Sequence, residues 1–202
     1  MSFIQKIIIK KIQSCIQKGD AEKALRKTDL LRLPQERHYY KGVCCFELGD
    51  LAKAQTHLES ALAFDSNNAA VVHILAQVYM LQKQWDQALK VLSPYKTQPE
   101  AERIITMINK GAESRQEYLN YITLVRKAMS MLKAQKYEEA VACLKNALHY
   151  TEEKAKVFNQ IGAVYFNYLK DHSKAEEFFS KAYQILPSDK EIKMNYAKAK
   201  LT

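Results

Sequence analysis

Apolar and small residues recur along the chain at an interval close to 34 residues. Ala54 and Ala88 lie 34 residues apart, and Ala140 and Ala175 lie 35 apart. A period of this size is typical of stacked helical hairpins, each of which buries its apolar side against the next. The pattern therefore predicts an all-α array of hairpins, with a long surface left free for a partner.

The clearest copy of this pattern runs from Phe158 to Pro187. Its recurring residues are Phe158, Ile161, Gly162, Tyr165, Ala175, Phe179, Ala182 and Pro187. In order and type they resemble the W, L, G, Y, A, F, A, P pattern of the tetratricopeptide repeat family. Small residues let two helices approach closely, and large ones fill the remaining space. The resemblance implies a right-handed α-solenoid of about five hairpins whose function is to bind other proteins.

Three further copies keep the spacing with looser chemistry, and a degenerate first copy precedes them. The second copy has Gly42, Cys45, Ala54, Leu58 and Ala61; the third has Val72, Leu75, Ala76, Tyr79, Ala88 and Leu92; the fourth has Leu124, Ala128, Met131, Ala140, Leu144 and Ala147; the first has Ile8, Ile12, Cys15, Ala24 and Leu31. Within hairpins, turns are predicted at Gly19-Asp20, Gly49-Asp50, Lys83-Gln84 and Gln135-Lys136.

The spacing is interrupted once, because Ala88 and Ala140 lie 52 residues apart. Pro94 should end the preceding helix, and Pro99 should begin a short helix over 100–109 that ends before Gly111. A capping box at Ser114 and Glu117 then predicts a long helix through Lys133. We expect an N-terminal repeat block over 1–95, an interrupting helix and loop over 96–114, and a C-terminal block over 115–202. The alternative is a sixth repeat that has lost half its length. In either case we hypothesise that 96–114 is the mobile joint.

The end of the chain predicts a capping helix. Ser188 and Glu191 have the spacing of a capping box, and Ile192 and Tyr196 give one apolar side to a segment that is otherwise rich in lysine. Terminal repeats need a polar outer face, so this helix is expected to cover the last hairpin.

In the tetratricopeptide family, the inner wall is made mostly by the first helix of each hairpin. The resemblance places a set of residues there, which we call the inner-face positions. They are Tyr39, Val43 and Phe46; His73, Gln77 and Met80; Val125, Met129 and Leu132; Asn159, Ala163 and Phe166; and Ile9, Gln13 and Ile16 in the degenerate copy. Most are large and apolar, which favours a groove for an apolar or amphipathic segment of a partner protein. The alternatives are that these residues are ordinary core, or that a homodimer buries them.

The net charge of +9 is concentrated at the two ends of the chain. Residues 1–34 hold eight Lys or Arg against three acidic residues, and residues 188–202 hold four Lys against two. This distribution favours partners with acidic flanks. It also supports a second interpretation, in which the N-terminal helix docks a basic scaffold on an anionic membrane or nucleic acid. Nucleic acid is disfavoured because aromatic and arginine residues are not interleaved.

The segment Phe3–Ile16 is rich in isoleucine but contains Lys6, Lys10 and Lys11. It is too interrupted for a membrane span, which needs about 18 apolar residues, and it does not have the order of a signal peptide. It fits either a basic amphipathic helix on a membrane surface or the first helix of the array.

The sequence contains no pattern that indicates catalysis, a cofactor or a metal ion. Its five histidines do not form an H-x-x-x-H pair, and there is no glycine-rich phosphate loop. The four cysteines, Cys15, Cys44, Cys45 and Cys143, have neither a metal nor a disulfide spacing. Together with the absence of a signal peptide, they favour the reducing cytoplasm, although a chain whose leader had been removed would look the same. The sequence thus predicts a non-enzymatic adaptor, scaffold or chaperone.

Overall fold

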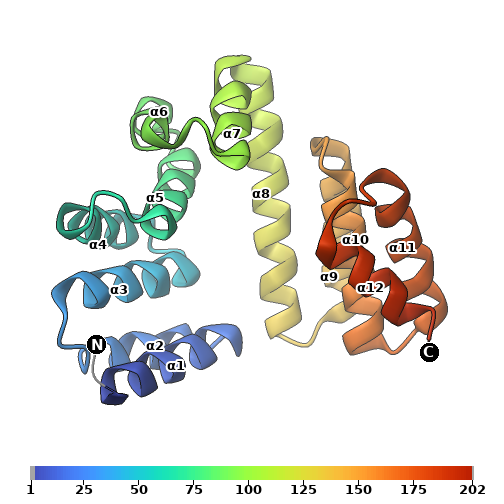
Figure 1. The fold of residues 1–202 in the computed structure, drawn as a ribbon, viewed down its shortest axis with the longest axis horizontal. Helices are drawn as coiled ribbons and strands as arrows, with labels where there is room; N and C mark the ends of the chain where they lie inside the picture. Colours follow the sequence, from blue (N-terminus) through green and yellow to red (C-terminus); the bar gives the residue numbers. More distant parts are fainter. Residues whose placement is uncertain (1–2, 202) are drawn as a thin grey trace. The chain divides into compact units, whose positions relative to one another are not determined.

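The computed structural model describes residues 3–201, and within this range the regular structure is helical, without strands (Figure 1). The prediction of an all-α solenoid of helical hairpins is confirmed. The chain forms two compact units, Met1–Ala112 and Glu113–Thr202, each of which is described by itself below.

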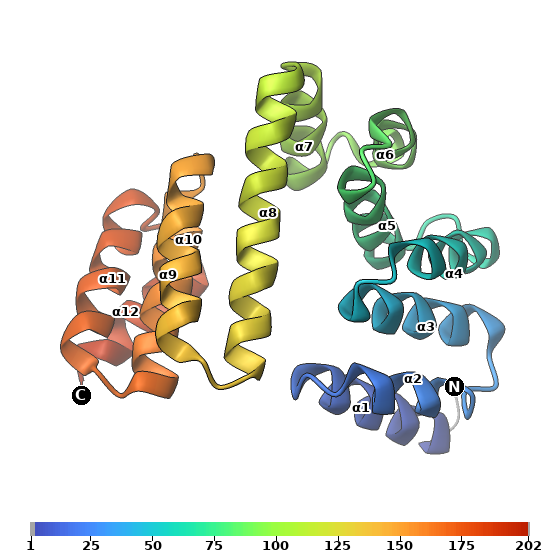
Figure 2. The same ribbon diagram turned by 180° about the vertical axis from the view of Figure 1, so that it is seen from behind.

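The first unit contains three helical hairpins followed by one further helix. The hairpins are α1 (Phe3–Gln17) with α2 (Ala21–Thr28), α3 (Pro34–Leu48) with α4 (Leu51–Phe64), and α5 (Ala69–Leu81) with α6 (Trp85–Leu92). Each second helix packs on the first helix of the next hairpin, and α3 also contacts both α1 and α5. Figures 1 and 2 both show α3 between the α1–α2 hairpin and the α4–α5 pair. The first helices of this unit therefore form one continuous layer.

The turn inside each hairpin has the same backbone geometry. Its first residue has a positive φ of 80° at Gly19, 81° at Gly49, 61° at Lys83, 61° at Gln135 and 56° at Lys170. Four of these five are the turns predicted from the sequence, which the structure confirms. Glycine adopts this conformation without strain, whereas Lys83, Gln135 and Lys170 adopt it at a cost.

The predicted interruption contains the helix expected from the sequence. After α6, the chain tightens into a 3₁₀ turn at Ser93–Tyr95, which includes Pro94, and α7 (Pro99–Asn109) follows and packs on α6. The expected capping box at Ser114 is wrong, because α8 (Ala112–Lys133) has already begun there. Gly111 has a positive φ of 121°, which glycine adopts without strain, and α8 begins directly after it, before Ser114. The end of this helix at Lys133 is confirmed.

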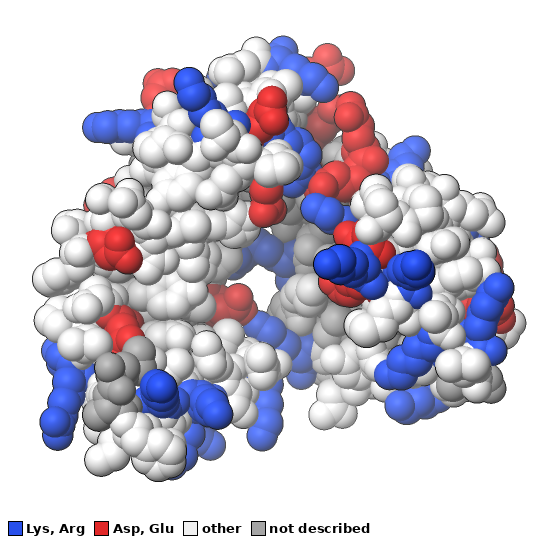
Figure 3. Space-filling model, viewed as in Figure 1, with Lys and Arg blue, Asp and Glu red and all other residues white. Residues whose placement is uncertain are grey.

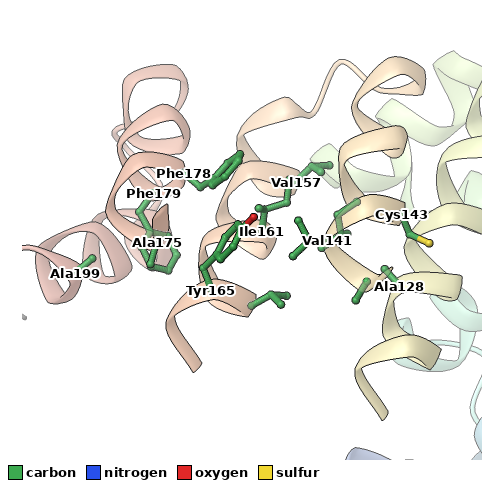
Figure 4. Packing of buried hydrophobic residues seen from close by; sticks show 13 residues of the cluster. Ala128, Val141, Cys143, Val157, Ile161, Tyr165, Ala175, Phe178, Phe179 and Ala199 are labelled. Carbon is green, nitrogen blue, oxygen red and sulfur yellow. The ribbon is translucent and has the colours of Figure 1, made fainter. Parts of the chain in front are cut away.

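The second unit contains two hairpins and a final helix. Helix α8 is followed by α9 (Tyr137–Ala147), which continues into a 3₁₀ turn at Leu148–Tyr150. Next come α10 (Lys154–Val164), extended by a π-helical turn at Tyr165–Leu169, then α11 (His172–Ile185) and α12 (Lys190–Ala199). The core that joins these helices is apolar and includes Val157, Ile161 and Phe179 (Figure 4).

Gly162 sets how closely α10 and α11 approach. An ideal Cβ at this position would lie 2.7 Å from Cδ1 of Phe179, nearer than a real side-chain carbon comes. The buried Phe179 ring therefore occupies the space over the Gly162 backbone. This is the small-against-large packing that the sequence pattern predicted for these two positions.

Helix α12 covers the last hairpin, as the predicted capping helix should. It packs on α10 and α11 through Ile192 and Ala199, both of which are buried. The expected cap at Ser188 is displaced by one residue, because the Asp189 carboxylate accepts hydrogen bonds from the backbone N–H groups of Glu191 and Ile192, at 2.9 and 3.0 Å. A carboxylate at the N-cap also complements the helix dipole, which favours Asp189 over the neighbouring serine.

Candidate protein-binding surface

The first helices of the hairpins carry the predicted inner-face positions. In the structure some of these positions are accessible to solvent and others are buried. In the first unit, Tyr39 and Val43 are half-buried on α3, and His73 and Gln77 are half-buried on α5. Gln77 Nε2 lies 2.8 Å from His73 Nε2, so this polar pair is held along the helix surface. These four residues keep part of their side chains accessible.

Three inner-face positions are buried, which corrects the expectation that they are open. Phe46 and Met80 belong to the buried hydrophobic residues, and Asn159 is a buried polar residue. For Met80 the reason is that α5 is apolar nearly all round, with seven buried residues, and such a helix lies inside its unit. Asn159 is covered by α12: its Nδ2 donates to Glu191 Oε1 at 3.2 Å, and its Oδ1 accepts from Asn195 Nδ2 at 3.0 Å.

The degenerate first copy behaves as the first helix of the array. Ile9 and Ile16 pack, half-buried, against a cluster that contains Ile12 and Tyr40. Gln13 is exposed, and its Nε2 donates to the Tyr40 hydroxyl at 3.2 Å. Burial raises the pKa of the Tyr40 phenol, so it stays neutral and able to accept this bond. The inner-face positions of α1 thus serve mainly to join it to α3.

In the second unit, α8 carries the most open apolar row. Val125, Met129 and Leu132 have the i, i+4, i+7 spacing that places them on one helix face. Val125 and Leu132 are half-buried against the core shared with α9 and α10, whereas Met129 is 42% exposed. This arrangement leaves a flexible thioether side chain in solvent between two partly covered aliphatic ones.

Ala163, on α10, and Phe166, in the π-helical turn that extends it, are half-buried against the same core. The Phe166 ring meets the His172 ring edge-on, with 5.1 Å between the ring centroids. The Nζ of Lys198, on α12, lies 4.9 Å from the centroid of Phe166. The aromatic position predicted from the sequence is therefore paired with a cation that the sequence analysis did not assign to the site.

The basic residues of α12 are the part of the surface that the sequence analysis missed. Lys200 Nζ lies 4.6 Å from the Tyr196 ring centroid, and a hydrogen bond with Lys200 lowers the pKa of the Tyr196 phenol. The signal was present: Ile192 lies 34 residues after Phe158, so the repeat spacing places α12 where the first helix of a following hairpin would lie. A terminal helix in that position adds its lysines to the surface beside α10, on which it packs.

Within the described residues, the titratable side chains show no grouping suited to binding a metal ion, and the thiol with the most strongly shifted pKa is unreactive. Between residues 3 and 201, no three His, Cys, Asp or Glu side chains are grouped closely enough to hold a metal. Burial raises the pKa of the Cys44 thiol to about 12, which makes it a poor nucleophile. None of the helices in this range is long and apolar enough to cross a membrane.

Stacked helical hairpins and a terminal capping helix define a helical repeat protein. Two tetratricopeptide repeat models match the sequence, over residues 46–107 and 125–190, which together are more than half of the chain. The chain belongs to the tetratricopeptide repeat family. No curated protein sequence matches it.

Among solved structures, the chain is similar to other helical repeat proteins. A double mutant of MamA from strain RS-1 is 20% identical with a TM-score of 0.47, and covers 93% of this chain and 97% of its own. MamA from Desulfovibrio magneticus RS-1 is 21% identical with a TM-score of 0.44, covering 94% and 99%. A thermophilic tetratricopeptide repeat protein of Thermus thermophilus is 18% identical with a TM-score of 0.43, covering 98% and 100%.

Proposed function

We propose that this chain is a non-enzymatic adaptor or chaperone that binds an apolar or amphipathic segment of another protein. The second unit provides the binding surface, formed by the open side of α8, by Phe166 in the π-helical turn after α10, and by Lys198 and Lys200 at the end of α12. The observation that carries the proposal is that Met129 is substantially exposed in the middle of an apolar helix face. Methionine adapts its shape to different partners, and it is frequent on surfaces that bind amphipathic helices.

The partner segment is proposed to have acidic groups next to its apolar ones. Lys198 lies in the last turn of α12, which packs against α10, and Lys200 directly follows this helix; both hold their ammonium groups over aromatic rings. A carboxylate entering beside Phe166 or Tyr196 would exchange a weak cation–π contact for an ion pair without displacing the apolar contacts. A homodimer that buries the same α8 face is the second candidate, and it is a binding function of the same surface.

The cytoplasm is the compartment that we propose for this function. The four cysteines are free in the structure, and free thiols persist in reducing compartments.

The test is capture of a partner by tagged protein, compared between wild type and Met129→Glu. The substitution places a charge in an apolar contact, so we expect partner binding to weaken at least about tenfold. Ile185→Glu is the matched control, because Ile185 is also exposed but lies on α11, a second helix. Mass spectrometry of the captured proteins and an affinity measurement on the enriched partner provide the readout.

Salt separates this function from binding to a polyanion. Apolar capture should survive about 0.5 M salt, whereas binding to phosphate groups should fall steeply with ionic strength. If Met129→Glu and Ile185→Glu bind the partner equally well, the proposed surface is wrong. A concentration-dependent dimer that only Met129→Glu dissociates would assign the same face to self-association.

A further inference from the structure

Large apolar side chains gather in solvent at one end of the first unit. On α1, Phe3 is 78% exposed, Ile4 is 64% exposed, and Ile7 is also exposed. On the segment after α2, Leu30 is 61% exposed, and Leu33 is exposed as well. Apolar residues scattered singly over a surface are normal, but five within two short segments form a patch.

The two segments are joined by the side chain of Gln5. Its Nε2 donates to the Leu30 carbonyl at 3.4 Å, and its Oε1 accepts from the Arg32 backbone N–H at 2.8 Å. Gln5 is itself buried, so this connection is part of the packed structure. It fixes Leu30 and its neighbours against the first turns of α1, so the exposed Leu30 and Leu33 lie at the same end of the unit as Phe3, Ile4 and Ile7.

The core of the unit does not use these side chains. Helix α1 packs on α2 and α3 through its opposite side, where Ile12 is buried and Ile8, Ile9 and Ile16 are half-buried. The sequence supports two interpretations of this helix, as the first element of the array or as a membrane-binding helix. The structure makes it the first element and also leaves a second apolar set facing water. The two interpretations are compatible.

Basic residues surround the apolar ones. Lys6, Lys10 and Lys11 are exposed on α1, and Arg32 is exposed between Leu30 and Leu33. Figure 3 shows the blue side chains at this end of the unit, at lower left. Since residues 1–34 carry eight basic and three acidic groups, the surface is strongly cationic. We call the five apolar and four basic residues the N-terminal patch.

We propose that the N-terminal patch docks on an anionic lipid surface. Aliphatic and aromatic side chains enter the boundary between headgroups and acyl chains, while lysines beside them reach the lipid phosphates. Each basic residue near an anionic surface adds to such binding, so neither the apolar nor the basic residues need to act alone.

The charge of the patch argues against two other occupants. A second copy of the same patch would bring two cationic surfaces together, which repel each other. Nucleic acid would satisfy the lysines, but it would leave Ile4, Ile7 and Leu30 without an apolar environment, and these residues offer no platform for stacked bases. A lipid surface satisfies both components.

The test is flotation of the full chain with vesicles of phosphatidylcholine alone or mixed with phosphatidylglycerol. We expect binding to the mixed vesicles and little to the neutral ones. Lys6→Gln with Lys10→Gln and Lys11→Gln should lower the partition constant about 100-fold. Phe3→Ser with Ile4→Ser and Leu30→Ser should lower it at least about tenfold. Every changed side chain is exposed, so circular dichroism and the melting temperature should stay close to wild type.

The matched control is Phe64→Ser with Ile185→Ser and Met194→Ser, three comparably exposed apolar residues outside the patch. This control should bind vesicles like the wild type. Met129→Glu should also bind normally, because the lipid surface does not depend on the proposed partner-binding face.

A gain-of-signal measurement complements these losses. In a Phe3→Trp variant, tryptophan emission should shift to shorter wavelength with the mixed vesicles, over the background from Trp85, the native tryptophan. Equal binding to neutral vesicles, unchanged binding by both patch variants, or an unshifted Phe3→Trp emission would each overturn the proposal. So would dimerisation through the patch in the absence of lipid.

Discussion

His38 and His57 face each other across the α3–α4 hairpin, with their Nδ1 atoms 3.3 Å apart. The Phe64 ring stacks on His38, with 6.1 Å between the ring centroids. Burial lowers the pKa of His57, and the nearby His38 and Lys41 lower it further because both oppose a second positive charge. This environment therefore favours the neutral form of His57.

This pair predicts a loss of stability in mild acid. The folded pKa of His57 lies below its ordinary value of 6.5, so just below that pH the unfolded chain binds more protons than the folded one. The free energy of unfolding should therefore fall as the pH drops below about 6.5, and level off below the folded pKa. Urea unfolding of wild type and His57→Gln between about pH 5 and pH 7 measures it. The variant should show the shallower pH dependence, and equal slopes would contradict the assignment.

At the level of individual residues, the sequence predicted the core but not the exposure of the inner-face positions. The repeat pattern gave the right core residues, such as Leu58, Ile161 and Phe179, because small and large residues alternate at fixed positions. It did not separate Met129, which is exposed, from Met80, which is buried, although both are inner-face positions. The exposure of an inner-face residue depends on neighbouring helices, and the repeat pattern of one hairpin does not contain them.

At the scale of the element, the second helices of three hairpins begin with the same device. Asp20, Asp50 and Asp171 accept the backbone N–H three residues later, at 3.1, 3.1 and 3.0 Å. In each case that residue is a lysine whose ammonium also contacts the carboxylate. The N-cap residues of α6 and α9 are Gln84 and Lys136, whose side chains make no capping bond.

This difference predicts that Gln84→Asp stabilises the protein. Gln84 has φ −88° and ψ 66°, close to the −93° and 64° of Asp20, so a carboxylate there would reach the Gln87 N–H without a backbone change. The expected gain is about 1 kcal/mol in the free energy of unfolding. Chemical denaturation of wild type, Gln84→Asp and Gln84→Ala tests it, since alanine removes the glutamine without adding a cap. An equal change in both variants would show that capping is not the cause.

The elements themselves were predictable where the chemistry is local. Pro94, Pro99 and the hairpin turns were placed correctly because proline and the left-handed turn act within a few residues. The helix starts at Ser114 and Ser188 were wrong because another local signal was available, the turn at Gly111 in one case and an aspartate cap in the other.

At the scale of the whole molecule, the chain divides between Ala112 and Glu113, within the segment 96–114 that the spacing marked as an interruption. Helix α7 groups with the first unit, on which it packs through α6. The turn at Lys110 and Gly111 therefore lies at the end of that unit. The proposal that this segment is the mobile joint is open to a direct test.

Limited trypsin digestion should cut first within 96–114, at Lys96 or Lys110. Exposed turns between units open more readily than turns inside a packed hairpin. Lys83 and Lys170 are the internal controls, because both are exposed at hairpin turns. Mass spectrometry of the earliest fragments identifies the site. Cleavage at Lys83 or Lys170 as fast as within 96–114 would place the weakest point elsewhere.

The sequence by itself determined the helical repeat, its family, its turns and most of its core, because these depend on residue spacing and on contacts within one hairpin. Only the tertiary structure decided which inner-face residues are open. In the structure Met80 and Asn159 are buried and Met129 is exposed to solvent. Gln5 holds Leu30 beside the exposed end of α1. The physical reason is that burial and surface composition arise between elements distant in sequence, where a repeating pattern carries no information.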